Sequence, residues 1–386
     1  MMALKLALRN LFGAGLRTWL NVIVLSFSYV IIIWYQGLID GWNLQARRDM
    51  IAWEIAGGQY WQKNYDPYDP FTLENSHSRI PAGLSDNNTA PLLISQGTIY
   101  PEGRIQAVLL KGIRKDQQVI RIPSDKLIVE NGEIPVIIGT RMAKNNKLET
   151  GDYLTMRWRD VNGTFDATEV RIAAIFKTDV PTIDNGQIWL SLEHLQKMLQ
   201  LEGEATLIIT GPELAGTKAF SGWDFKSQDF LLADLDQIIK QKSIGGSVMY
   251  ILLLMLAMLA IFDTQVLSIF RRQKEIGTFV ALGMTRGQVV KLFTVEGGLI
   301  SVLAAMAGAV YGIPLLILQH HEGYAMPYET DDLGITIAEK IYPTYSLGLI
   351  AGTIVVIMIT ATIVSYMPAR KIAKMNPTDA IKGKIQ

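Results

Sequence analysis

The stretch RRQKEIGTFVALGMTRGQ, residues 271–288, lies between two long apolar blocks of the chain. Gly283 is expected to end a helix here, and Thr285 with Gln288 forms a capping box that starts the next one. Apolar residues recur at helical spacing on one side of the first helix, with polar groups opposite: Ile276, Phe279, Val280, Gly283 and Met284. The stretch therefore predicts a short amphipathic helix between two membrane spans.

Four apolar blocks are long enough to cross a bilayer. The first, at about 19–39, contains no charged residue, and at 1.5 Å per residue it spans roughly 30 Å, the thickness of a bilayer core. A cleaved signal peptide is the alternative, because three basic residues precede the block. The apolar core of a signal peptide is only about 7–15 residues long, shorter than the block at 19–39, so a retained helix is favoured. The other blocks lie at about 247–270, 293–318 and 345–367.

The charges between the blocks predict the orientation. Segments 1–18 and 271–292 and the tail after Met367 are rich in Lys and Arg, whereas the 319–344 loop is acidic. Basic residues stay on the cytoplasmic side of a membrane, so we expect both termini to be cytoplasmic. The expected segments are a cytoplasmic N-terminal amphipathic segment at 1–18, spans at 19–39, 247–270, 293–318 and 345–367, an outer domain with its stalk at 40–246, a cytoplasmic helix at 271–292, an outer loop at 319–344 and a cytoplasmic tail at 368–386.

Two features of the spans have both a packing and a functional interpretation. Small residues recur every four positions, and ordinary packing within the chain is the simpler interpretation. They are Ala304, Gly308 and Gly312 in the third span and Gly348 and Gly352 in the fourth. Asp263 lies in the second span, about two turns from its cytoplasmic end. An acid in a membrane helix is a functional candidate, but a structural hydrogen bond explains Asp263 equally well.

Residues 40–246 have the composition of a globular domain. Strand-like and helix-like segments are mixed along them, which predicts an α+β domain. The aromatic, turn-rich segment 60–70 is expected to be a loop, and the amphipathic segment 227–242 is expected to form a stalk that leads into the second span. The expected strands lie at 104–110, 134–138, 153–159, 169–176, 187–190 and 206–209, and the expected helices at 140–147 and 191–199.

Composition and motifs exclude several function classes. Lys+Arg and Asp+Glu are both 36, which argues against a nucleic-acid binder. The chain has no cysteine and only four histidines. None of these histidines stands at metal-ligand spacing, apart from the adjacent pair His320–His321, expected in a loop where the two side chains make a poor chelate. Hydrolase and zinc-protease motifs are absent, so we expect a non-catalytic chain without a metal site.

At these motifs the sequence resembles the FtsX-like permease family, which includes lipoprotein-releasing permeases, MacB-type exporters and the cell-division protein FtsX. The lipoprotein-releasing permeases are the members that it resembles most in character. The resemblance is carried by EIG at 275–277, ALGMTR at 281–286, EGG at 296–298, PARKIAKMNPTDAI at 368–381 and, in the outer domain, IGTRMA at 138–143, LETGD at 148–152, AIFKTD at 174–179 and QIWL at 187–190. Region 43–130 carries none of these motifs.

The resemblance implies a membrane subunit of an ATP-binding-cassette transporter in a bacterial inner membrane. In that family the 271–288 helix is the coupling helix, seated in a groove of the ATPase. Carried over, the residues that would contact the partner are Glu275, Ile276, Gly277, Leu282, Gly283 and Met284. No phosphate loop (G-x-x-x-x-G-K-[ST]) occurs in this chain, so ATP and magnesium are expected in a separate ATPase dimer. A second permease copy, or a related permease, would complete the assembly.

Three uses of such a machine remain open from the sequence. The first is release of lipoproteins from the inner membrane, possible partners being a lipoprotein or its periplasmic carrier. It predicts an apolar cavity between the first two spans of paired copies, near Val30, Ile33 and Trp34. The second is MacB-type export of drugs or peptides. The third is control of a periplasmic cell-wall hydrolase, which usually goes with a smaller outer domain than the one expected here.

Overall fold

The structure is a computed structural model that describes residues 16–84, 88–129, 132–216, 218–325 and 340–372. The described residues form two compact units, one made of the residues up to 43, 239–325 and 340 onward, the other of 44–238. Most of the predicted N-terminal segment, residues 326–339 of the predicted outer loop and the end of the predicted tail lie outside the described residues.

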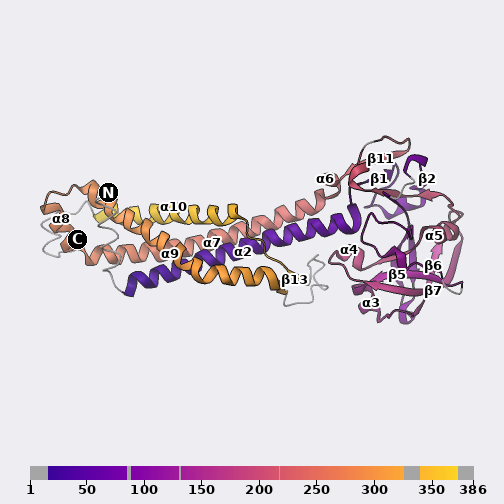
Figure 1. Ribbon diagram of the computed structural model, residues 1–386, viewed down its shortest axis with the longest axis horizontal. Helices are drawn as coiled ribbons and strands as arrows, with labels where there is room; N and C mark the ends of the chain where they lie inside the picture. Colours follow the sequence, from indigo (N-terminus) through magenta and orange to yellow (C-terminus); the bar gives the residue numbers. More distant parts are fainter. Residues whose placement is uncertain (1–15, 85–87, 130–131, 217, 326–339, 373–386) are drawn as a thin grey trace. The chain divides into compact units, whose positions relative to one another are not determined.

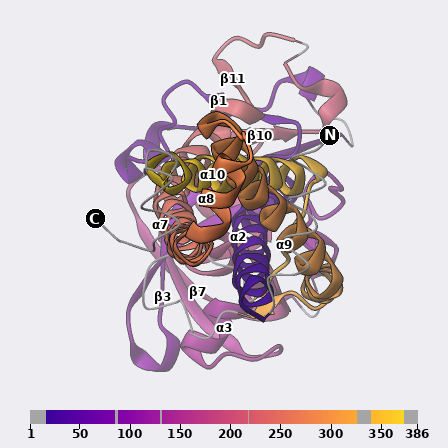
Figure 2. The same cartoon turned by 90° about the vertical axis from the view of Figure 1, so that its left-hand side faces the viewer.

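Four long helices dominate the first unit (Figures 1 and 2). They are α2 (Leu16–Met50), α7 (Ala233–Arg271), α9 (Arg286–Glu322) and α10 (Leu347–Ile372). All four are long and apolar enough to cross a membrane. They contain the four predicted spans except residues 345–346, and these spans are thereby confirmed as helices. The short helix α8 (Gln273–Ala281) separates α7 from α9, and β12 (Tyr324–Ala325) pairs with β13 (Lys340–Ile341).

All four long helices contribute to one apolar core in this unit. Its fully buried members include Val22 and Ile32 of α2, Ala257 of α7, Ala304 of α9 and Ala361 of α10. Small residues let α9 approach α2 closely. A Cβ built on Gly312 would lie 2.6 Å from Cγ2 of Val30, and one on Gly308 would lie 3.2 Å from the carbonyl oxygen of Ser26.

The packing interpretation of the small residues is confirmed for one of the two series. Ala304, Gly308 and Gly312 are buried within the chain. Gly348 and Gly352 are exposed on α10, and a Cβ on Gly352 would meet nothing within 4 Å among the described residues. His320 and His321 lie in the last turn of α9, so their expected place in a loop was wrong. The apolar helix continues to Glu322, and Gly323 ends it.

The second unit is built on a nine-stranded mixed sheet with the strand order β11-β1-β10-β3-β4-β8-β5-β7-β6. Its strands are β1 (Gly58–Gln62), β3 (Thr89–Ile99), β4 (Gln106–Ile113), β5 (Ile134–Gly139), β6 (Tyr153–Arg159), β7 (Phe165–Phe176), β8 (Gln187–Ser191), β10 (Leu207–Thr210) and β11 (Trp223–Ser227), with a further pair of β2 (Ser78–Arg79) and β9 (Glu204–Ala205). Pairs β4–β8 and β5–β7 are parallel, and the other pairs are antiparallel.

An additional pairing of β3 with β6 closes part of this sheet on itself. Gly97–Ile99 of β3 pair with residues of β6, while the first half of β3 pairs with β10. Strands β3, β4, β8, β5, β7 and β6 thus form a closed ring. Its interior is apolar, with Ile99, Leu110, Ile138, Met156 and Ile172 fully buried. A second core covers the other face of β3 and β4.

Short helices complete this unit. They are the α-helices α3 (Thr140–Asn146), α4 (Pro181–Asp184), α5 (Leu192–Leu199) and α6 (Gln228–Leu231), the π-helix η1 (Ile51–Ile55) and the 3-10 turns η2 (Pro70–Asn75), η3 (Ala82–Leu84), η4 (Pro101–Gly103), η5 (Ser124–Lys126) and η6 (Pro212–Leu214). The strands and helices expected from the sequence are all present, within a few residues at their ends. The domain is β-rich, and α3 and α5 contribute buried side chains to the same core as the ring.

Two expectations for this unit need correction. Segment 60–70 is not entirely loop, because Tyr60 to Gln62 belong to the buried strand β1, between β10 and β11. In the sequence GQYWQ of β1, apolar and polar residues do not alternate, so the strand could not be recognised from the sequence. The expected stalk at 227–242 is helical but not continuous, because Leu232 separates α6 from α7.

Candidate functional site

The α8 corner, defined as residues 272–285, connects α7 to α9. Helix α8 ends before Leu282, and Gly283 has a φ of +95°, a conformation that glycine adopts without the steric cost of a Cβ. The side chain of Thr285 then accepts a hydrogen bond from the backbone N–H of Gln288 (3.4 Å), and the Gln288 side chain accepts one from the Thr285 N–H (2.8 Å). The predicted helix stop and capping box are confirmed.

One face of α8 is buried within the chain. Ile276 is 5% exposed and packs with Val289, Phe293 and Ala369. Val280 and Met284 pack against the same cluster and are partly buried. The amphipathic pattern of the sequence therefore reflects packing of α8 on α9 and on the end of α10.

The opposite side of the corner is exposed. Of the six residues predicted to contact a partner, Glu275, Leu282 and Gly283 are exposed, and the Leu282 side chain is 80% exposed. Ile276 and Gly277 are buried, and Met284 is partly buried. A single exposed apolar side chain does not by itself mark an interaction surface, but Leu282 is accessible to a partner. Of the six predicted contact residues, those that another protein can reach are therefore Glu275, Leu282 and Gly283.

A buried ion pair anchors the start of α8. Nη1 of Arg272 donates to both carboxylate oxygens of Glu296 (3.1 and 3.0 Å), and Nε of Arg272 donates to Oε2 of Glu275 (2.9 Å). The guanidinium also lies 5.1 Å from the centre of the Phe293 ring. Glu296 is only 5% exposed. Sequence reasoning missed this contact, although an acid inside the third apolar block was a signal that it could have used.

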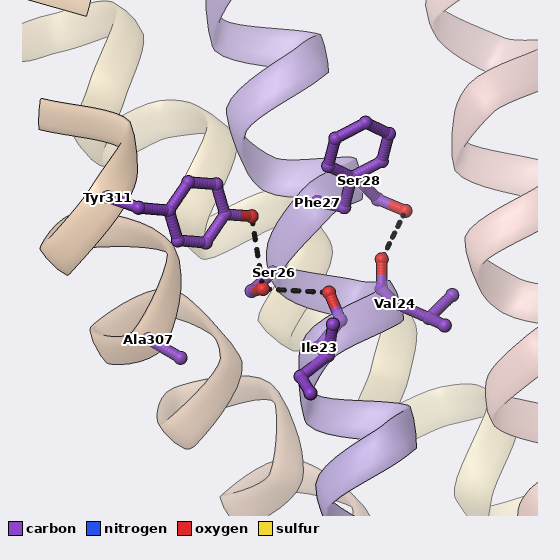
Figure 3. Close-up of a pocket in the computed structure, with 7 residues that line it drawn as sticks. All are labelled: Ile23, Val24, Ser26, Phe27, Ser28, Ala307 and Tyr311. Carbon is purple, nitrogen blue, oxygen red and sulfur yellow. Dashed lines mark hydrogen bonds between the residues drawn. The ribbon is translucent and has the colours of Figure 1, made fainter. Parts of the chain in front are cut away.

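An apolar groove of about 570 Å³ lies between α2 and α9 (Figure 3). Its lining residues are Ile23, Val24, Ser26, Phe27, Ser28, Ala307 and Tyr311. Ser26 Oγ donates to the carbonyl oxygen of Ile23 (2.7 Å) and lies 3.1 Å from the Tyr311 hydroxyl, as Figure 3 shows. Because the Ser26 and Tyr311 hydroxyls bond to each other, the groove presents an apolar surface.

The residues predicted to line a substrate cavity lie elsewhere on α2. Val30 and Ile33 are buried, and Val30 packs against Gly312. Trp34 is half-buried, with its ring edge-on to Tyr324 at 5.8 Å between centroids. None of these three lines the groove of Figure 3. The expected cavity belongs to a pair of copies, so it remains a prediction.

Asp263 is exposed on α7. Within the described residues its side chain makes no hydrogen bond or ion pair, so the expected structural hydrogen bond is not formed there.

Comparison with known proteins identifies the class. Residues 247–377, which hold most of α7 and all of α8, α9 and α10, match the FtsX-like permease C-terminal family. The chain is 24% identical to an uncharacterized ABC transporter permease of Methanocaldococcus jannaschii, over 68% of this chain and 65% of that protein. It is 23% identical to the lipoprotein-releasing system transmembrane protein LolC of Xylella fastidiosa, over 76% of this chain and 77% of LolC.

A shorter match joins the chain to another branch of these transporters. It is 22% identical to the macrolide export ATP-binding/permease protein MacB of Neisseria gonorrhoeae, over 40% of this chain and 23% of MacB. The chain therefore contains an FtsX-like permease domain, and its relatives are permeases of ABC transporters. More particularly, the chain is similar to LolC and, over a shorter stretch, to MacB, and its FtsX-like permease domain lies at 247–377. The resemblance inferred from the sequence is confirmed.

Proposed function

We propose that this chain is the permease subunit of a transporter that releases lipoproteins from a bacterial inner membrane, driven by a separate cytoplasmic ATPase. The observation that carries the proposal is the length of the LolC match. It extends over about three quarters of both proteins, whereas less than a quarter of MacB is matched. The similarity to LolC therefore includes much of the outer domain, where a lipoprotein or its periplasmic carrier would be handled.

The orientation that we propose places the α8 corner and both termini in the cytoplasm. Arg271, Lys274, Arg286 and Lys291 are all exposed around this corner, and an excess of such residues marks the cytoplasmic side. The ATPase dimer would dock on the exposed Leu282–Gly283 turn. ATP and magnesium would be bound by that dimer, and this chain would contribute no catalytic group.

The proposed mechanism is transmission of motion. Closure of the ATPase dimer would push on the α8 corner, and the long helices of two permease copies would carry the motion to the outer domains. A partner shifts the equilibrium between two conformations of the permease only by the difference in its affinity for those two conformations. The corner is suited to this role because an apolar cluster and a buried ion pair fix α8 to α9.

Depletion of the chain in its own host tests this function. Lipoproteins should accumulate in the inner membrane, and wild-type chain expressed in trans should restore their sorting. Leu282→Ser should fail to restore it, because the variant removes the exposed apolar contact. Ile105→Ser, a matched change at an exposed isoleucine of the outer domain, should restore it.

The other outcomes point to the rival functions. Normal lipoprotein sorting with increased sensitivity to drugs or peptides would replace the proposal with MacB-type export. Normal sorting with a defect in cell separation would replace it with control of a cell-wall hydrolase.

A further inference from the structure

Arg272 occupies the joint between two helices. Helix α7 ends at Arg271 and α8 begins at Gln273, and Arg272 itself has a non-helical backbone with φ −94° and ψ 14°. A single residue therefore sets the angle between α7 and α8. Its side chain lies at this joint and is placed to hold that angle.

The two carboxylates that Arg272 contacts are not equivalent. The Glu296 side chain is 6% exposed, whereas the Glu275 side chain is 59% exposed. Exposed ion pairs are weakened by solvent screening and contribute little, whereas loss of one partner of a buried pair leaves a charge without compensation. Glu296 on α9 is therefore the partner that holds Arg272, and Glu275 adds a weaker contact on the solvent side.

The apolar contacts of α8 do not explain the need for this pair. Ile276, Val289 and Phe293 already attach α8 to α9. Apolar attraction has no preferred direction, so the cluster alone allows α8 to rotate or slide. Nη1 of Arg272 donates to both carboxylate oxygens of Glu296 on α9, and this directional contact restricts both motions.

We propose that Arg272 is the positioning residue of the α8 corner, acting through Glu296. The pair makes α8 and α9 move together, so that a displacement at the Leu282–Gly283 turn reaches the third span without loss. This inference deepens the proposed function and rests on it for the source of the displacement. The position of α8 itself can be tested without any partner.

The first experiment measures α8 in the full-length chain. Because the sequence has no cysteine, Thr278→Cys and Lys291→Cys place one spin label on α8 and one on α9, both at exposed positions. Double electron–electron resonance in lipid nanodiscs then gives the distribution of distances between them. Wild type should give one narrow distribution.

The variants must fold, so that a change in the distance distribution reports the position of α8 and not a loss of folding. Arg272→Met or Glu296→Leu alone leaves one buried charge without a partner, which destabilises the fold, so the double variant Arg272→Met/Glu296→Leu is the informative one. Apolar replacement of a buried ion pair is commonly neutral or stabilising, and we expect this variant to fold with at least a twofold broader distance distribution. Glu275→Gln is the control and should keep the wild-type width.

Two results would overturn the inference. A double variant with the wild-type width would show that the apolar cluster alone positions α8. A broadening in Glu275→Gln as large as that of the double variant would show that Glu275, not Glu296, holds Arg272.

The second experiment asks whether position matters for coupling. In the complex purified with its ATPase, the double variant should still co-elute with the ATPase and keep the wild-type KM for ATP. The kcat for ATP hydrolysis during transport should fall about tenfold or more. Arg272→Lys keeps the charge without the planar donor geometry and should be intermediate. An unchanged kcat for ATP hydrolysis in a variant whose α8–α9 distance distribution is broadened would contradict the coupling role of Arg272. If no ATPase co-elutes with wild type, the proposed function fails, while the distance measurement still decides the role of Arg272.

Discussion

Gly297→Ala is the substitution whose cost the structure predicts most sharply. Gly297 of α9 faces Ser365 of α10, and a Cβ built on it would lie 1.9 Å from Oγ and 2.4 Å from Cβ of Ser365. Ser365 is fully buried, and its hydroxyl donates to the carbonyl oxygen of Ala361 (2.7 Å). The serine therefore cannot turn away freely, and α9 and α10 would have to separate. Overpacking of this kind costs about 1–3 kcal/mol.

The assay is thermal unfolding of the full-length chain in detergent, followed by tryptophan fluorescence. Gly352→Ala is the matched control, because nothing among the described residues lies within 4 Å of its Cβ and alanine favours a helix by about 1 kcal/mol over glycine. Gly297→Ala should lower the midpoint, and Gly352→Ala should not. Adding Ser365→Gly to Gly297→Ala should recover part of the loss. Equal midpoints for the two alanine variants would refute the close packing of α9 on α10.

Three further predictions concern single side chains. Thr285→Ala removes the cap of α9 and should cost about 1 kcal/mol, seen as faster amide exchange in its first turn; unchanged exchange would contradict it. Burial lowers the pKa of His194 below its ordinary value, so the folded state binds a proton less readily than the unfolded state. Stability should therefore fall as the pH drops below about 6.5, and denaturant midpoints should show a smaller fall in His194→Asn; an equal fall would exclude His194 as the cause. Lys111 is 5% exposed and lies 3.5 Å from Glu54, whose side chain is 29% exposed, so Lys111→Met should cost about 3 kcal/mol, the low end for a buried pair. The exposed Lys126→Met should stay within about 0.5 kcal/mol in the same denaturation, and equal costs would argue against the buried pair.

Local signals made the membrane unit and the α8 corner predictable. Apolar length alone located the four helices. The glycine stop at Gly283 and the cap at Thr285 act within a few residues, so the sequence shows them directly. Strand β6 was also predicted at its observed ends, because its exposed and buried residues alternate from Tyr153 to Arg159.

Contacts between distant residues could not be predicted in the same way. Strand β3 was missed because its first six residues are all buried and show no alternation, and it contains Pro91. The closure of the ring depends on Gly97 meeting Trp158, a pairing that no local pattern indicates. The Arg272–Glu296 pair joins residues that are far apart in the sequence. From the sequence, Arg272 could not be distinguished from the other basic residues around α8, although its guanidinium binds Glu296 within the chain.

The central claim is that the exposed turn at Leu282 receives the motion of a nucleotide-hydrolysing partner. A photoreactive amino acid placed at Leu282 in the full-length chain, activated in intact cells, tests it directly. The account predicts a covalent adduct with a cytoplasmic ATPase. Adducts with lipid alone, or with a protein of the outer side of the membrane, would contradict it.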